Sequence, residues 1–190
     1  MMRYSVFVYG SLLSPESLLS TLPEADLAEV RPSRLRGYQR VFDVAFPNDG
    51  SQSDKSYFDD NDGRPPFVLF ANLAVRPSAV VNGVVVPVSE SQLQRLCDRE
   101  RRYQLTECSD LVDNSSRSEA SRVVTFVGAP EFTAPERVDA GVAAKNYVDL
   151  MHAGARFWDE RHPGFLNDFH MSTRMPSAAP IVPLRRVDHT

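Results

Sequence analysis

The sequence has few cysteines and no long apolar run, and each shortage narrows what the protein can be. Only 2 of its 190 residues are cysteines, too few for a disulfide scaffold and without the paired spacing of a zinc site. We expect Cys97 and Cys108 to be small buried thiols. The longest apolar stretch, residues 84–88, is far shorter than the roughly 20 residues that span a bilayer. The chain opens without a basic segment followed by an apolar one, so we expect a soluble, cytoplasmic protein.

The charge balance argues against a nucleic-acid or membrane partner. Lysine and arginine together number 21 against 25 aspartates and glutamates, which gives a formal net charge of −4 and no general attraction for phosphate backbones or acidic lipids. The basic residues are 19 arginines and only two lysines, Lys55 and Lys145. The nucleotide composition of a genome can produce such a bias without a functional cause, so its meaning stays open here.

The length and the composition indicate one folded domain. A chain of 190 residues with 42% hydrophobic and 24% charged residues can bury a sizeable core. We expect a single domain over residues 1–190. Residues 47–66, rich in Asp, Asn, Gly, Ser and Pro, predict a long mobile loop, and the proline-punctuated segment from about residue 176 predicts a tail on the surface.

The sequence predicts a strand, a glycine turn and a helix at its start. Residues 3–9 are β-branched and aromatic and end at Gly10 and Ser11, which is typical of a buried strand followed by a tight turn. Ser14 and Pro15 then have the residue types of a helix N-cap and first position.

Further elements follow from periodicity and composition, and they place the chain in the α+β class. A helix is expected from Ser89, whose spacing to Gln92 fits a capping box, to near residue 102, and another over residues 142–155. Asn82 and Gly83 predict a hairpin turn or a bulge. Strands are expected over residues 35–46, 67–75, 79–88, 103–108 and 122–127. The most economical architecture is a small mixed β-barrel or a strongly curved sheet with flanking helices.

One acidic residue stands where an apolar one is expected. On a helical wheel the stripe of Leu93, Leu96 and Cys97 continues to Glu100. Burial of a carboxylate raises its pKa, which is how proteins make a general acid and base. The structural alternative is a glutamate that forms an ion pair with an arginine. The same wheel turns four arginines away from the stripe, and we expect them to be solvated: Arg95, Arg99, Arg101 and Arg102.

The turn after the first strand is the second candidate feature. Backbone N–H groups between a buried strand and a helix can bind an anion or a developing oxyanion, and Gly10 lets a ligand approach the main chain closely. Most such turns bind only water. This turn matches neither phosphate-binding glycine motif, and Ser11 does not lie in G-x-S-x-G.

No metal or cofactor site is predicted. The four histidines lack the spacing of a zinc site. The acidic cluster around Gly63 fails as a calcium loop, because Phe58 and Leu69 would occupy its first and last ligand positions.

Taken together, these residues resemble the γ-glutamylcyclotransferase superfamily. The resemblance lies in V-F-V-Y-G-S-L-L at residues 6–13, R-L-R-G-Y-Q-R-V-F at 34–42, N-G-V-V-V-P-V-S at 82–89 and L-C-D-R-E-R-R-Y at 96–103, with a fainter match over residues 146–155. It implies a small mixed barrel with flanking helices. Arg101 follows Glu100 where many members have a glycine, and this leaves the choice of substrate open.

The resemblance also implies an activity and a set of site residues. The substrate's own α-amine would attack its γ-carbonyl, which releases 5-oxoproline and an amine or amino acid without a cofactor. Glu100 would transfer the protons, and Tyr103 is a further candidate for the site. For both Tyr103 and Tyr147 the alternative is a role in the hydrophobic core. The expected substrate-binding residues are Tyr9, Gly10, Ser11, Leu12 and Tyr147.

The expected partner is a small γ-glutamyl compound, and the oligomeric state stays open. The rival hypotheses are a non-catalytic member that binds a γ-glutamyl or amino-acid-like ligand, and an enzyme that trims a γ-glutamylated biosynthetic intermediate. An arginine locking Glu100 away from any pocket would favour the binding protein.

Overall fold

A computed structural model describes residues 3–113, 121–175 and 179–189. Within these residues eight strands form one mixed sheet in the order β5-β6-β1-β4-β2-β8, with β7 joined to β4 and β9 joined to β7. The strands of this sheet are β1 (Arg3–Val8), β2 (Arg31–Pro47), β4 (Phe67–Val88), β5 (Tyr103–Glu107), β6 (Ser121–Gly128), β7 (Gly141–Ala144), β8 (Thr173–Arg174) and β9 (Ile181–Val182).

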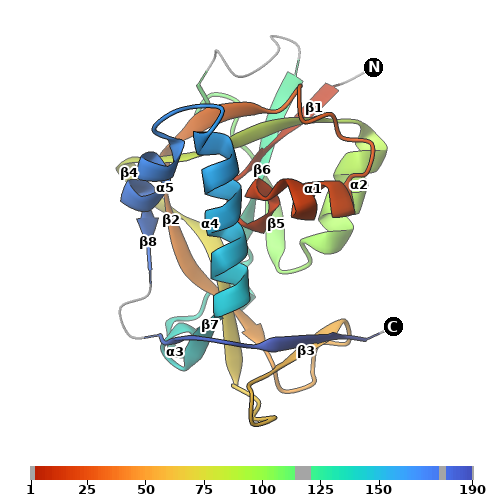
Figure 1. The fold of residues 1–190 in the computed structure, drawn as a ribbon, viewed down its shortest axis with the longest axis vertical. Helices are drawn as coiled ribbons and strands as arrows, with labels where there is room; N and C mark the ends of the chain where they lie inside the picture. The colour runs from red at the N-terminus through yellow and green to blue at the C-terminus, as the bar shows by residue number, and fades with distance from the viewer. Residues whose placement is uncertain (1–2, 114–120, 176–178, 190) are drawn as a thin grey trace.

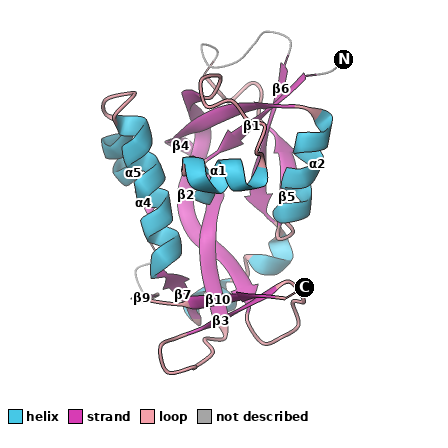
Figure 2. Cartoon of the chain, turned by 45° about the vertical axis from the view of Figure 1, so that its right-hand side comes forward, coloured by secondary structure: helices cyan, strands magenta, loops and turns pink. Residues whose placement is uncertain are grey.

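The helices pack beside this sheet, which confirms the α+β class. Figure 1 shows α5, α4, α1 and α2 in a row along one side of it, and Figure 2 shows the same order from a second angle. The helices are η1 (Ser11–Leu13), α1 (Pro15–Thr21), α2 (Glu90–Arg99), η3 (Pro130–Phe132), α3 (Pro135–Asp139), α4 (Lys145–Asp159) and α5 (Phe165–Ser172). None of the helices in the described part of the chain has the length and apolar character needed to cross a bilayer.

The sheet is curved and open, which matches the strongly curved sheet among the two predicted alternatives rather than a closed barrel. Its end strands β5 and β8 do not pair with each other in the described ranges. The long antiparallel pair of β2 and β4 shifts register between Arg36 and Tyr38 and again between Phe42 and Val44, and such bulges bend a sheet. Gly37 lies at one shift with a φ of 82°, a backbone conformation that side chains disfavour.

The prediction of two strands over residues 67–88 is wrong, because β4 runs through both without a turn. Asn82 and Gly83 pair in register with β2 rather than reversing the chain. The Asn82 side chain explains its residue type: Nδ2 donates to the Phe165 carbonyl at 2.8 Å, which joins the strand to α5. The register shift falls earlier, in the exposed segment before Val80.

The predicted loop over residues 47–66 contains a strand, and the predicted surface tail contains two. β3 (Lys55–Phe58) pairs antiparallel with β10 (Arg185–Asp188), and we call this pair the β3–β10 ribbon. It crosses the lower end of the molecule in Figure 2. Asn48 holds the entry to the ribbon, since its amide bonds both the N–H and the carbonyl of Tyr57 at 2.9 and 2.8 Å. Short polar segments without periodicity gave no sign of this pairing between distant residues.

Two helix boundaries also differ from the predictions. The Ser89 capping box is present with both of its bonds, but α2 ends at Arg99 rather than near residue 102. The helix expected from residue 142 begins at Lys145, because Gly141–Ala144 pair with β4 as β7. Elements at other predicted positions, including β1, the helix after Pro15, β5 and β6, lie where expected.

The core is divided in two. The main cluster includes Val6, Leu35, Leu96, Met151 and Trp158 and lies between the sheet and the helices. A smaller cluster lies beneath the β3–β10 ribbon and consists of Phe46, Tyr57, Val68, Ala144 and Leu184.

Helix α4 holds the turn after β1 in place through a close backbone contact. A Cβ on Gly154 would lie 2.5 Å from Leu13 C and from Ser14 N, so only glycine allows this approach. One turn further along α4, Trp158 Nε1 donates to the Leu13 carbonyl at 2.9 Å. The helix and the turn therefore pack as a unit.

Gly154→Ala tests this contact, because the packing and the helix propensity predict opposite signs for the change in the free energy of unfolding. Alanine is favoured over glycine in a helix by about 1 kcal/mol, yet here its methyl group must displace backbone atoms, and such overpacking costs about 1–3 kcal/mol. We expect a net fall in the free energy of unfolding, measured by urea denaturation. Ala153→Gly, on the exposed face of the same helix, calibrates the propensity alone. A Gly154→Ala protein as stable as the parent would contradict the packing.

Candidate functional site

A cavity lies where one edge of β4 has no strand beside it. On this edge β7 pairs with residues 67–69 and β1 pairs with residues 84–88, and no other described strand fills the interval. Tyrosine side chains satisfy the backbone there instead. The Ala71 N–H donates to Tyr147 Oη at 3.3 Å, and the Ala71 carbonyl accepts from Tyr103 Oη at 2.7 Å. The interruption of the sheet thus creates the cavity, and two tyrosines line it.

The inner cavity brings all seven of the predicted site residues together. It encloses about 350 Å³ of space, part of it open to solvent. Its remaining walls are apolar and come from Phe7, Val8, Ala71 and Phe126. The predicted residues that line it are Tyr9, Gly10, Ser11, Leu12, Glu100, Tyr103 and Tyr147.

The turn after β1 presents unused backbone donors to the cavity. Its carbonyls are occupied, since Gly10 O accepts from Leu13 N and Ser11 O accepts from Ser14 N, both at 3.0 Å. The N–H groups of Gly10, Ser11 and Leu12 have no acceptor among the described residues. A Cβ on Gly10 would lie 3.2 Å from Tyr147 Oη, so a side chain at this position would fill the space where a ligand could meet the main chain.

Arg40 fixes the turn from behind. Its side chain is completely buried, and Nε donates to the Tyr9 carbonyl at 2.8 Å. The rest of the guanidinium bonds the Asn82 carbonyl and Thr173 Oγ1, and its carbon lies 4.4 Å from the centre of the Phe169 ring. Burial lowers the pKa of Arg40 to about 9. The guanidinium is thereby held by neutral oxygens and a ring rather than by a described carboxylate.

Glu100 reaches the cavity from the end of α2. It is the C-cap residue, with φ −88° and ψ 47°. Its side chain still lies on the inward side that the helical wheel predicts, and it lines the cavity. Its side chain is 19% exposed. Oε1 accepts from Arg99 Nε at 3.1 Å, whereas Oε2 accepts no hydrogen bond from the residues that the structure describes. One carboxylate oxygen is therefore available to a ligand in the cavity.

The ion pair with Arg99 corrects the prediction that this arginine points to solvent. The Arg99 guanidinium also bonds Ser17 Oγ at 3.1 Å and Thr21 Oγ1 on α1, and it lies 3.3 Å from Ser11 Oγ. It thus joins the two helices at the edge of the cavity. The structural alternative considered for Glu100, an arginine pair, is present, but the pair does not close Glu100 off from the cavity.

Opposing effects set the proton affinity of Glu100. Burial raises the pKa of its carboxyl group, while Arg99 lowers it through charge and a hydrogen bond, and Lys55 and Arg102 lower it further. The net shift is upward. A carboxyl group with a raised pKa that is accessible in a cavity is suited to take up and return a proton.

The three tyrosines differ in what their hydroxyl groups can still do. Burial raises the pKa of each phenol, so all three stay protonated near neutral pH. Tyr9 donates to the Phe126 carbonyl at 2.6 Å and Tyr103 donates to the Ala71 carbonyl at 2.7 Å. Tyr147 accepts from Ala71 N, and its own hydroxyl hydrogen has no acceptor in the described part of the chain. Tyr147 is therefore the phenol that can donate to a ligand.

A wider cleft opens outside the inner cavity. It encloses about 1540 Å³, including space open to solvent, and shares Ser11, Glu100, Tyr103 and Tyr147 with the inner cavity. Five cationic side chains line it, from α2, the residues after α2 and both strands of the β3–β10 ribbon: Lys55, Arg99, Arg101, Arg102 and Arg186. Lys55 is notable in the sequence only because lysine is scarce. Lys55 and Arg186 reach the cleft because β3 pairs with β10.

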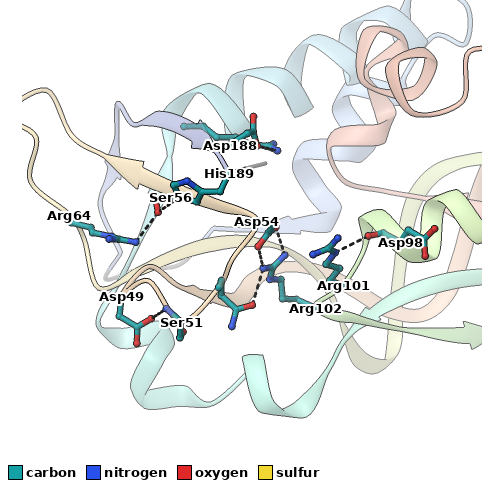
Figure 3. Close-up of polar contacts among 12 residues, drawn as sticks. Asp49, Ser51, Asp54, Ser56, Arg64, Asp98, Arg101, Arg102, Asp188 and His189 are labelled. Carbon is teal, nitrogen blue, oxygen red and sulfur yellow. Dashed lines mark hydrogen bonds and ion pairs between the residues drawn. The ribbon is translucent and has the colours of Figure 1, made fainter.

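Arg102 is a second correction to the prediction of solvated arginines. It is only 5% exposed, because the chain turns after Arg99 and directs this side chain inward. Figure 3 shows its guanidinium between the end of α2 and the segment before β3. There it pairs with Asp54, bonds Gln52 Oε1 at 2.9 Å and lies 4.8 Å from the centre of the Phe46 ring. Arg102 therefore anchors the cleft wall, whereas Arg95 is exposed enough to pair with Glu24 at the surface.

Metal ligands do not gather in this region. Among the described residues no three His, Cys, Asp or Glu side chains lie together in a way that could hold a metal ion. The donors that do converge are backbone amides, a phenol, a carboxylate and cationic side chains, a set suited to an organic ligand with anionic and carbonyl groups.

Solved structures with the same fold include several γ-glutamyl cyclotransferases. One described by that name alone has 18% sequence identity and a TM-score of 0.54, covering 92% of this chain and 90% of its own. A yeast γ-glutamyl cyclotransferase specific to glutathione has 15% identity and a TM-score of 0.54, covering 92% and 98%. An uncharacterized protein from Homo sapiens has 19% identity and a TM-score of 0.54, covering 96% and 94%.

These similarities confirm the predicted fold. The chain has the γ-glutamylcyclotransferase-like fold over most of its length. No protein-family model matches the sequence, and no curated protein sequence matches it either.

The buried environment of Glu100 predicts that removal of its carboxylate stabilises the fold. Because the folded pKa is raised, the folded state binds more protons than the unfolded state between the unfolded pKa of about 4.3 and the raised value, so stability falls as the pH rises through that window. We expect Glu100→Gln to raise the melting temperature at pH 7.5, with the gain shrinking toward pH 4.5. Glu90→Gln, at an exposed position of the same helix, controls for loss of one charge. A larger fall for Glu100→Gln than for this control would show that the ionised carboxylate stabilises the fold.

Proposed function

We propose that the protein is a γ-glutamyl cyclotransferase. The observation that carries this proposal is the inner cavity, which the carboxylate of Glu100, the free amides of the turn and the Tyr147 hydroxyl line together. The fold of the chain, which solved γ-glutamyl cyclotransferases share, supports it. The same donor set would suit any ligand with a carbonyl and a carboxylate. The fold shared with γ-glutamyl cyclotransferases is the reason to choose a γ-glutamyl compound among these ligands.

The nucleophile of the proposed reaction belongs to the substrate. The α-amine attacks the γ-carbonyl carbon, a new carbon–nitrogen bond closes a five-membered lactam, and the original γ-amide bond breaks. The products are 5-oxoproline and a free amine or amino acid. Because the two reacting groups are tethered, the protein needs no nucleophilic side chain, and what it must supply is positioning, proton transfer and stabilisation of the oxyanion.

Glu100 supplies the proton transfer in this proposal. Its open Oε2 accepts a proton from the α-ammonium group, which frees the amine lone pair, and the same carboxyl group then returns the proton to the leaving nitrogen. The ring nitrogen carries one further proton after the attack, and it gives this proton to the carboxylate as the γ-amide bond breaks, from where it passes to the released amine. No net proton is gained or lost by the protein. The raised pKa of Glu100 suits both halves of this exchange, since the group is a better base than an exposed glutamate and can still be ionised.

The turn and Tyr147 supply the positioning. The N–H groups of Gly10, Ser11 and Leu12 bind either the substrate carboxylate or the oxyanion that forms at the γ-carbon. The Tyr147 hydroxyl, which lies beside Gly10, donates a further hydrogen bond. Arg40 and the contact of α4 with the turn hold these donors rigid before the substrate arrives.

The alternative is a binding protein that uses the same cavity, and the pairing of Glu100 with Arg99 meets only half of the condition stated for it, because Glu100 still lines the cavity. An assay for products distinguishes the two. The protein is incubated with glutathione, γ-glutamyl dipeptides and γ-glutamyl amines, and 5-oxoproline and glutamate are measured by mass spectrometry. Cyclisation yields 5-oxoproline, hydrolytic trimming yields glutamate, and binding without either product would favour the binding protein.

Glu100→Gln tests the proposed base. The amide keeps the shape of the side chain but cannot take up the proton, so we expect the rate of 5-oxoproline release to fall by about 10²-fold or more. Glu90→Gln, which removes a carboxylate from the same helix outside both cavities, should retain the parent rate. Full release by the Glu100→Gln protein would show that the assigned role is wrong.

Arg99→Met tests how the ion pair tunes this base. Because the charge and the hydrogen bond of Arg99 lower the pKa of Glu100, their removal should raise that pKa further. The acidic limb of the pH profile of kcat/KM, where the base becomes protonated, should move to higher pH, whereas Arg99→Lys should leave it near the parent position. An unchanged limb in Arg99→Met would mean that a group other than Glu100 titrates there.

A further inference from the structure

The outer cleft is the place for whatever the γ-glutamyl group is attached to. Its walls continue those of the inner cavity through Ser11, Glu100, Tyr103 and Tyr147, and its enclosed space is several times larger. A substrate whose reacting carbonyl lies beside Glu100 must extend its leaving part into this cleft. The side chains of the cleft therefore meet the leaving part of the substrate.

Three of the five cationic side chains in the cleft already form ion pairs within the protein. Arg99 is bound to Glu100, Arg102 to Asp54, and Arg186 to Asp188 at 2.5 Å. Arg101 donates to a backbone carbonyl, that of Asp98, at 3.2 Å, as Figure 3 shows.

Lys55 is different. Its Nζ forms no ion pair and no hydrogen bond with any residue that the structure describes. The other lysine of the chain, Lys145, pairs with Asp149 at 2.5 Å outside the cleft.

The surroundings of Lys55 leave its charge poorly compensated. Three aromatic rings lie about its ammonium group, with centres 5.1 Å away for Phe70, 5.3 Å for Phe46 and 5.9 Å for Tyr57. Their faces attract a cation, but they replace water that would solvate it better.

The nearby charged groups leave a net positive field at this point. Burial and the charges of Arg186 and Arg102 together lower the pKa of Lys55 to about 8, although Asp54 and Glu100 act in the opposite direction. An ammonium group in this position gains more from an incoming anion than an exposed one does, because little water has to be displaced from it.

We propose that Lys55 is a specificity-determining residue that binds an anionic group, such as a carboxylate, on the leaving part of the substrate. The preferred substrates are then γ-glutamyl compounds whose leaving part ends in an acid, and those that end in a neutral group bind more weakly. This inference rests on the proposed function. Lys55 lies on the β3–β10 ribbon, outside the segments that carry the proposed reaction.

The scarcity of lysine makes the binding step directly observable. Protein labelled with ¹³C at the lysine ε-carbon contains two labelled side chains, Lys55 and Lys145, and the spectrum of Lys55→Met assigns their signals. Glycylglycine and glycylglycine amide are the probes, since they differ only in the terminal carboxylate. We expect glycylglycine to shift the Lys55 signal and to raise its titration midpoint above about 8, because an anion stabilises the ammonium form. The amide should do neither, and the Lys145 signal should not respond.

The catalytic step gives a second, independent readout. The pair of substrates is γ-glutamylglycine and γ-glutamylglycine amide. Loss of one charge-assisted hydrogen bond corresponds to about 10- to 100-fold in affinity, so Lys55→Met should raise KM for the acid by that factor with a smaller change in kcat. The KM for the amide should stay near its parent value. Methionine suits the aromatic surroundings, Lys55→Arg should recover part of the loss, and Lys145→Met is the matched control.

The outcomes separate this inference from the proposed function. If neither compound yields 5-oxoproline, the proposed function fails, and the spectroscopic titration still decides whether Lys55 binds the anion. If 5-oxoproline forms but Lys55→Met alters both substrates equally or neither, the role of Lys55 is wrong. Equal responses of the Lys55 signal to glycylglycine and to its amide, or no response to either, would also overturn it.

Discussion

The side chain of Arg40 brings a positive charge into the protein interior, where backbone carbonyls, hydroxyl groups and the Phe169 ring take the place of water. This desolvated group constrains the rest of the site, because it binds the carbonyl of Tyr9. The peptide that follows is trans, so the N–H of Gly10 points away from that carbonyl. A charge on the far side of the turn thus sets the direction of the Gly10 amide, while α4 sets the position of the turn through Gly154.

The elements that carry the site were predictable where the signal is local. A glycine after a buried strand, the N-cap and proline before α1, and the capping box of α2 depend on neighbours a few residues away. The inward place of Glu100 followed from helical periodicity, although the residue is the C-cap and the helix ends one turn earlier than predicted. That shorter helix is why Arg102 was misplaced, since an end near residue 102 would have kept it on the solvent face. Arg99 still belongs to α2, and it was misplaced because its partners on α1 are distant in the sequence.

The parts that could not be predicted depend on contacts between residues far apart in the sequence. The β3–β10 ribbon joins two segments more than 120 residues apart, and each is too short and too polar to show a strand period. Lys55 and Arg186 enter the cleft only because of this pairing. The gap on the edge of β4 is equally hidden, because it reflects where β1 and β7 stop pairing rather than any property of β4 itself.

The division of the core gives the two halves of the site different packing partners, with Tyr147 as the residue that contacts both clusters. The turn, α2 and α4 pack on the main cluster, whereas the wall that carries Lys55 lies on the small cluster of Phe46, Tyr57 and their neighbours. Core substitutions act mainly on the residues that they touch. Changes beneath the β3–β10 ribbon can therefore reshape one wall of the outer cleft, and they reach the inner cavity through Tyr147, which packs against both clusters. Such a scaffold can diversify in the ligands that it accepts as long as Tyr147 keeps its place beside Gly10.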